Sequence, residues 1–176
     1  AGGGVLRLCG RGCGELRHKE GIWPAWPRRY EIFEPYYCQA EALFHVHGER
    51  GEDPHEPWSS KPYPFPPVSH EPRIQVLNDT LLREGLHPFH LPLGILLDEK
   101  NGVPTPTSLC MRCSNFAGFP CLLTRQAAAQ VILIPPLLAL HPNVTFLPHP
   151  HVSTLASSAA DRVVAWLPFT RTARAG

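Results

Sequence analysis

The spacing of hydrophobic positions predicts three helices, and the clearest lies between residues 22 and 46. Apolar residues recur there at intervals of three and four, in one stripe made of Phe33, Tyr36, Tyr37, Ala40 and Phe44. The first helical position tolerates a proline, which suits Glu34-Pro35 as the start. Gly48 provides an end. The pattern therefore predicts an amphipathic helix with an aromatic, apolar face.

Two further helices are expected. Residues 72–84 place Ile74, Leu77 and Leu81 on one face, and Gly85 is a typical stop signal. Residues 124–133 are rich in alanine, which favours a helix. The proline pair at 135–136 is expected to end or sharply bend that third helix.

The segment between the first two helices carries seven prolines in residues 49–72. Such a composition is found in polyproline ligands for aromatic grooves and in extended loops laid over a domain surface. We favour the loop, with Tyr63 and Phe65 as the side chains that would hold it down. After the second helix, residues 87–97 are expected to be extended, and residues 98–107 to form a turn region.

The last part of the chain changes from helical to strand-like patterning. Short strands are expected at residues 144–147, 152–155 and 162–169, with residues 156–161 as a hairpin loop between the last two. The predicted fold class is thus α+β, in which amphipathic helices with Pro-rich loops precede a short β meander.

Composition narrows the function classes. Hydrophobic residues make up 43% and charged residues 18% of 176, so the chain has apolar material for a core. The 21 prolines argue against a long helical bundle. A net charge of +1 argues against nucleic-acid or anionic-membrane binding. The most apolar stretch, residues 131–140, is shorter than the roughly 20 residues of a transmembrane helix. No signal peptide is visible, so a cytoplasmic location is the default expectation.

Cysteines and histidines supply the candidate metal chemistry. Cys110-x2-Cys113-x7-Cys121 is the densest group, but a structural zinc site needs four ligands and no well-spaced fourth one is evident. We therefore expect no metal site, while a small metal-binding module built on these cysteines stays an alternative. The paired histidines at 45/47, 87/90 and 149/151 are interpreted as loop or surface residues.

A longer series of motifs has a more specific meaning. Trp26-Pro27, Tyr30, Glu34-Pro35-Tyr36-Tyr37, Ala40-Glu41 and Val46-His47-Gly48 follow one another at fixed spacing. The series continues collinearly to about residue 165 through Asp53-Pro54, Glu56-Pro57, Tyr63-Pro64, His70-Glu71-Pro72, Gly85-Leu86-His87-Pro88, Leu91-Pro92-Leu93-Gly94, Cys110-x2-Cys113, Gly118-Phe119-Pro120-Cys121 and His141-Pro142-Asn143-Val144. This order resembles a run found in bacterial glucose–methanol–choline (GMC) oxidoreductases.

The resemblance implies an internal segment of a two-domain, FAD-dependent oxidoreductase. Such enzymes oxidise the CH–OH group of an alcohol or sugar by hydride transfer to the flavin. In this reading residues 1–21 are a remnant of the FAD-binding domain, residues 22–125 form the substrate-side domain with its Pro-rich cover, and residues 126–176 return to the FAD-binding domain.

Site residues follow from the same resemblance. Val152 matches a position whose backbone contacts the adenine of FAD, and Gly2 and Gly3 match a Gly-Gly segment near the flavin. The dinucleotide fingerprint and the catalytic histidine of the family are expected upstream and downstream, so no catalytic residue is expected in this chain. The resemblance leaves the electron acceptor open. A Pro-rich interaction protein remains a second alternative.

Overall fold

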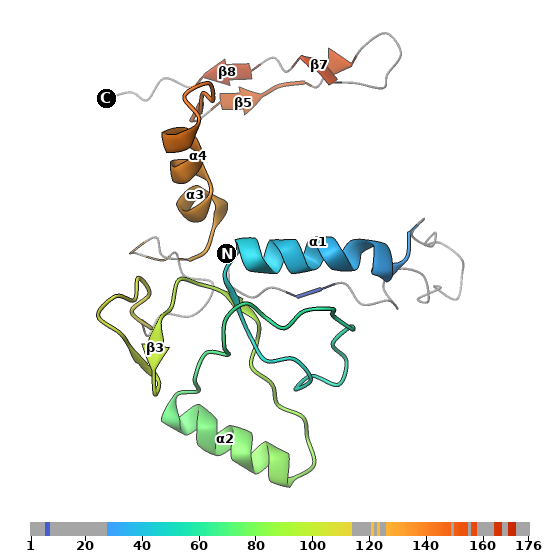
Figure 1. Cartoon of the computed structure of the whole chain (residues 1–176), viewed down its shortest axis with the longest axis vertical. Helices are drawn as coiled ribbons and strands as arrows, with labels where there is room; N and C mark the ends of the chain where they lie inside the picture. Colours follow the sequence, from blue (N-terminus) through green and yellow to red (C-terminus); the bar gives the residue numbers. More distant parts are fainter. Residues whose placement is uncertain are drawn as a thin grey trace. The chain divides into compact units, whose positions relative to one another are not determined.

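The computed structural model of the chain describes residues 6–7, 28–113, 121, 123, 126–148, 150–154, 156–157, 164–166 and 169–171. It divides into two compact units, Ala1–Ile134 and Pro135–Gly176. Figure 1 labels many of the elements, which are α1 (Tyr30–Leu43), β1 (Val46–His47), α2 (Pro72–Arg83), β2 (Leu93–Gly94), β3 (Glu99–Lys100), β4 (Val103–Pro104), α3 (Ala129–Ile132), α4 (Ile134–Leu140), β5 (Pro150–Val152), β6 (Ala156–Ser157), β7 (Val164–Trp166) and β8 (Phe169–Arg171). This mixture of helices and short antiparallel strand pairs confirms the α+β class.

Helix α1 forms where the sequence predicts a helix, but its start and its buried face differ from the prediction. It begins at Tyr30, so Pro35 lies inside the helix and not at its first position. The buried residues are Tyr30, Glu34, Cys38 and Glu41. Tyr36, from the predicted apolar stripe, is 65% exposed. The face that packs inward is thus polar, because its carboxylates have buried partners elsewhere in the chain.

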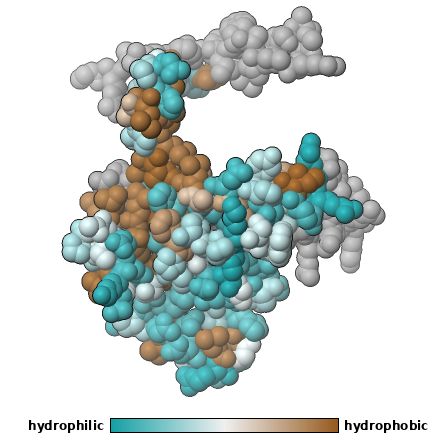
Figure 2. All heavy atoms as spheres, viewed as in Figure 1, coloured by the Kyte–Doolittle hydropathy of each residue, from teal (hydrophilic) through white to brown (hydrophobic). Residues whose placement is uncertain are grey.

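Helix α2 agrees with the prediction. Pro72 occupies its first turn and Gly85 follows its end with a φ of 76°, a left-handed conformation that favours glycine. None of its residues is buried. In Figure 2 hydrophobic atoms reach the surface at this helix, where Ile74 and Leu77 are 47% and 52% exposed.

The Pro-rich loop is held against β1 by the two aromatic residues predicted to do so. The Phe65 ring stacks on His47 and on His45 at centroid distances of 5.1 and 5.2 Å. Its backbone accepts a hydrogen bond from the N–H of Gly48 at 3.1 Å and donates one to Val46 at 3.3 Å. The Tyr63 ring packs directly on Gly48. The extended-loop interpretation is therefore confirmed.

Short antiparallel pairs complete the first unit. Strand β1 pairs with β2 through Val46↔Gly94 and His47↔Leu93, around the fully buried Val46. Strands β3 and β4 pair across a two-residue turn, Asn101-Gly102, whose φ values of 53° and 76° are those of a hairpin turn. The expected turn region at residues 98–107 is therefore confirmed.

The third helix ends just before its proline pair, as predicted, but residues 126–128 are not helical and the helix that begins at the prolines, α4, was not predicted. Pro135 and Pro136 lie in the first turn of α4, while the shorter α3 precedes it. Backbone N–H groups in a first turn have no partner within the helix, so prolines there remove no hydrogen bond and can begin a helix as readily as end one. Residues 124 and 125 lie outside the described residues.

The tail is strand-rich as predicted, but its pairing is that of a hairpin and not of a meander, and β6 lies within residues 156–161, where a loop was expected. Strand β5 pairs with β8 and β6 pairs with β7, both antiparallel (Figure 1). The predicted strand at 152–155 begins where β5 ends, and the strand predicted at 162–169 is divided between β7 and β8. Residues 144–147 form no strand; the Val144 N–H bonds back to His141 in a turn, and Pro142 and Pro148 flank the segment.

Across the part of the chain that the structure describes, every helix is too short or too polar to span a lipid bilayer.

Candidate functional site

The most concentrated group of charged side chains lies under the inner face of α1. Arg7, whose side chain is 2% exposed, donates from Nε and Nη2 to the two carboxylate oxygens of Glu41, at 2.6 Å each. Its Nη1 donates to the Tyr30 hydroxyl at 3.0 Å. Burial lowers the pKa of Arg7, but hydrogen bonds to Glu41, Tyr30 and Cys38 outweigh it and raise the pKa above its ordinary value. The guanidinium is thus permanently charged.

Glu34 ties the same helix face to the Pro-rich loop. Its carboxylate accepts hydrogen bonds from the Cys38 thiol at 3.0 Å and from the Ser60 N–H and hydroxyl at 2.7 and 2.9 Å. Hydrogen bonds from Cys38 and Ser60 lower the pKa of Glu34 to about 2, with a contribution from the charge of Arg7. Glu34 is therefore ionised at any physiological pH.

Arg50 connects Glu41 of α1 to Glu56 and Tyr63 of the Pro-rich loop. It donates to Glu41 at 2.7 Å and forms an ion pair with Glu56. Its guanidinium lies over the Tyr63 ring, 3.6 Å from the centroid, and the Tyr63 hydroxyl donates to Glu56. Burial, followed by the bond to Glu56, raises the pKa of Tyr63 above its ordinary value. We call Arg7, Glu34, Glu41, Arg50, Glu56 and Tyr63 the buried charge network.

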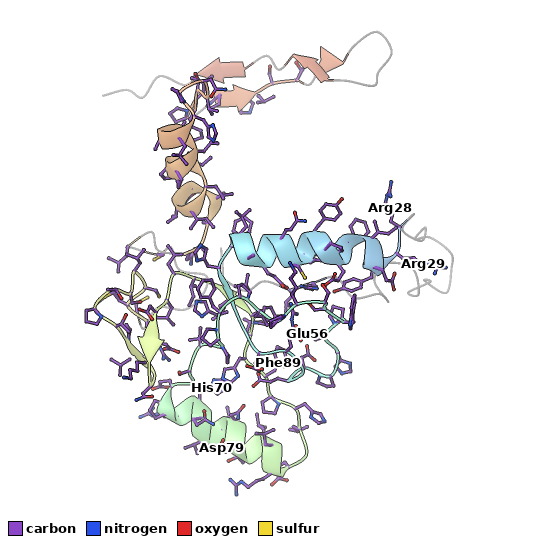
Figure 3. All side chains as sticks on the ribbon, viewed as in Figure 1. Arg28, Arg29, Glu56, His70, Asp79 and Phe89 are labelled. Atoms are coloured by element: carbon purple, nitrogen blue, oxygen red, sulfur yellow. The ribbon has the colours of Figure 1, made fainter. Side chains whose placement is uncertain are left out.

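A pocket of about 200 Å³ borders this network. Arg7, Glu56 and Tyr63 form part of its wall together with Phe89 and His90. Glu56 and Phe89 are labelled in Figure 3, below α1. The wall, which also includes Glu49 and Asp53, offers carboxylates, imidazole and aromatic rings to a small polar molecule, but three of its titratable side chains already bind charged partners outside the wall. Glu56 binds Arg50, Arg7 binds Glu41, and His90 binds Glu52.

Of the three residues predicted to contact FAD, only Val152 lies among the described residues. Val152 ends strand β5, pairs in register with Phe169 of β8, and is 45% exposed. Since β5 belongs to a two-stranded sheet, its other edge has no strand partner among the described residues. Gly2 and Gly3 lie outside the described residues. Val152 is in the second unit and the buried charge network is in the first.

The cysteine group is not assembled within the described residues. Cys110 is partly buried with its backbone N–H on Leu96, and Cys113 is exposed. The described residues contain no group of three or more His, Cys, Asp or Glu side chains suited to a metal ion. Cys9, Cys13 and His149 lie outside them.

Sequence reasoning missed the buried charge network. The available signal was the i, i+4, i+7 spacing of Glu34, Cys38 and Glu41, a polar stripe on the side opposite Tyr36. Its partners lie far away in the chain, since Arg7 and Glu41 are separated by 34 residues. The reciprocal pairing is therefore visible only once the chain is folded.

No protein-family model matches the chain, and no curated protein matches it significantly.

Proposed function

We propose that the chain forms the substrate-side part and Pro-rich cover of an FAD-dependent oxidoreductase of the GMC type. The enzyme oxidises the CH–OH group of an alcohol or sugar. The observation that carries the proposal is the collinear series of motifs from Trp26-Pro27 to His141-Pro142-Asn143-Val144. FAD, when bound, supplies the hydride acceptor.

The contacts among these motif residues support treating the series as one unit. Glu34, Glu41, Glu56 and Tyr63 come from four separate motifs, and all four belong to the buried charge network. Chance matches along a chain have no reason to meet in one network. In this proposal the motifs preserve the packing of α1 against the Pro-rich loop.

The protonation states of the network support a structural role for its acids. Oxidation of an alcohol needs a base that removes the hydroxyl proton, and such a base works best with a pKa near the operating pH. The pKa of Glu34 is about 2, so it is a poor base. Glu41 and Glu56 are held by arginines. The proton acceptor is therefore proposed to lie on a residue outside this network.

The fit to FAD rests on the edge of strand β5. Successive residues of an antiparallel strand direct their N–H and C=O groups alternately toward the partner and away from it. One of the adjacent residues His151 and Val152 therefore presents both groups at the edge of β5 that faces away from β8. A backbone N–H and C=O pair suits the acceptor and donor atoms of an adenine ring. The edge of β5 therefore offers a backbone N–H and C=O pair for the proposed contact, from Val152 or from its neighbour His151.

The alternative of a Pro-rich docking segment is less well supported. Two of its three aromatic side chains are already engaged, Tyr63 with Arg50 and Glu56, and Phe65 with His45 and His47. The third, Trp58, is 65% exposed. A polyproline ligand presents an extended, solvated backbone to its groove, whereas the backbone of Phe65 in this segment is hydrogen-bonded to Val46 and Gly48.

Flavin content and reduction test the proposal. The full-length gene product is expected to purify with bound FAD, and an alcohol or sugar is expected to bleach the flavin absorbance under anaerobic conditions. The 176-residue chain expressed alone is expected to carry no flavin and to show no turnover. A colourless full-length protein, or an active short chain, would contradict the proposal.

A further inference from the structure

A pair of stacked histidines joins the two ends of the arm that carries α2. We define the arm as residues 71–89, and it begins after His70 and ends before His90. The two imidazole rings lie face to face, 3.9 Å between centroids with 6° between planes. In Figure 3 His70 lies at the base of α2 and Asp79 lies along the helix. Because α2 has no buried residue, these contacts at the base hold the arm in place.

Glu52 holds one of the two rings from the Pro-rich loop. Its carboxylate accepts a hydrogen bond from the His90 backbone N–H at 2.8 Å and contacts Nδ1 of the same residue at 2.8 Å. An ionised carboxylate only accepts hydrogen bonds, so Nδ1 of His90 carries a proton.

His70 has the opposite environment. Its Nε2 is buried with no hydrogen-bond partner among the described residues. A proton added at Nε2 would place a positive charge against the face of His90, with no hydrogen-bond acceptor for the new N–H among the described residues. The groups that face His70 are His90, Glu52, and Asn78 and Asp79 of α2. Burial and the neighbouring His90 lower the pKa of His70, while Glu52, Asn78 and Asp79 oppose them without reversing the shift.

We propose that the His70–His90 stack is an acid-sensitive fastening that releases the α2 arm when His70 takes up a proton. The proposal does not depend on the oxidoreductase function. Release separates His70 from His90 and lets water reach both rings. Ser69, the residue before His70, stays anchored, because its N–H donates to Glu99 at 2.7 Å and its carbonyl accepts from Arg112 at 2.7 Å. Hydrogen bonds from Ser69 and Arg112 outweigh burial and lower the pKa of Glu99, so this anchor persists in mild acid.

The direction of the pH effect follows from proton linkage. His70 binds a proton more tightly in the released state than in the fastened state. The fastened state is therefore fully stable above the ordinary histidine pKa of about 6.5 and loses stability as the pH falls below that value. The loss ends once the pH passes the lowered pKa of His70. Each pH unit between those two pKa values increases the opening constant about tenfold.

The His90 amide is a direct probe, since its N–H is hydrogen-bonded to Glu52 only in the fastened state. Its hydrogen-exchange protection, corrected for the intrinsic pH dependence of exchange, is expected to fall several-fold between about pH 7.5 and about pH 5.5, a range that brackets the ordinary histidine pKa. In His70→Phe, which keeps a flat ring but cannot be protonated, protection is expected to hold or rise.

His87→Phe is the matched control, because His87 is exposed in the same arm. It is expected to keep the fall seen in the unmodified protein. If His70→Phe fails to fold, His70→Leu is expected to give lower protection that does not fall in acid. Unchanged protection in the unmodified protein, or an equal fall in the folded His70 variant, would overturn the proposal.

Discussion

Glu41 is the residue on which the buried charge network depends most. It accepts two hydrogen bonds from Arg7 and one from Arg50, and its side chain is 5% exposed. A carboxylate between two guanidinium groups offsets one of their two charges, and Glu34 and Glu56 supply further negative charge beside Arg7 and Arg50. Glu41 is the acid that contacts both arginines.

We predict that Glu41→Gln destabilises the protein by about 3 kcal/mol, the usual cost of breaking a buried ion pair from one side. The amide keeps the size of the side chain but removes the charge shared by Arg7 and Arg50, which leaves Arg7 with Glu34 at 3.6 Å and Arg50 with Glu56. Urea unfolding measures the change. Glu49→Gln, which alters an exposed carboxylate, is the control and is expected to cost less than about 0.5 kcal/mol. Equal losses in the two variants would mean that solvent already screens Glu41.

At the scale of elements, the Pro-rich loop is attached through the contact between Gly48 and Tyr63. A Cβ at Gly48 would lie 2.7 Å from Cδ2 and 2.8 Å from Cε2 of the Tyr63 ring. The ring cannot move away freely, because it packs against Arg50 and its hydroxyl bonds to Glu56. Glycine is needed here for close approach.

We therefore predict that Gly48→Ala costs about 1–3 kcal/mol through overpacking against a fixed ring. A double-mutant cycle gives the decisive measurement by thermal or urea unfolding. In a Tyr63→Ala background the same Gly48→Ala change is expected to cost no more than about 0.5 kcal/mol, since the clashing ring is gone. A similar cost in both backgrounds would point to a backbone effect at Gly48.

The elements also show which parts of the fold were accessible from sequence. Helix α2 was predicted well because Pro72 and Gly85 are local signals that act within the helix's own turns. Pro135 and Pro136 correctly marked the end of α3, but α4 was missed because a proline pair is compatible with both the end of one helix and the start of the next. Local patterns therefore located the elements better than they located the boundaries.

The candidate site was less accessible, for a physical reason. The aromatic stripe of α1 was predicted to be its buried face. The face that is buried instead holds Glu34 and Glu41, because Arg7 and Ser60, from distant parts of the chain, bind their carboxylates. The stack of His70 on His90 likewise joins residues on either side of α2. Such pairings depend on tertiary structure, and no local periodicity reports them.

At the scale of the whole molecule, the proposed cofactor contact links the tail to the function. Strand β5 pairs through Pro150↔Arg171, His151↔Thr170 and Val152↔Phe169 (Figure 1). If the backbone of Val152 recognises adenine, its side chain is of little consequence, whereas its N–H and its strand geometry are essential. Alanine and proline at this position separate the two contributions.

We predict that in the full-length protein Val152→Ala retains FAD while Val152→Pro loses at least about tenfold in FAD affinity. Proline removes one hydrogen-bond donor, worth about 0.5–1.5 kcal/mol, and also disturbs the strand, and about 1.4 kcal/mol corresponds to a factor of ten. Flavin retained after dialysis, together with a fluorescence titration of the apoprotein, measures the affinity. Near-equal loss in both variants would assign Val152 a side-chain packing role. Full retention in both variants would place the adenine contact elsewhere. His151 would then be the next residue to substitute, because its backbone groups point to the opposite edge of the strand from those of Val152.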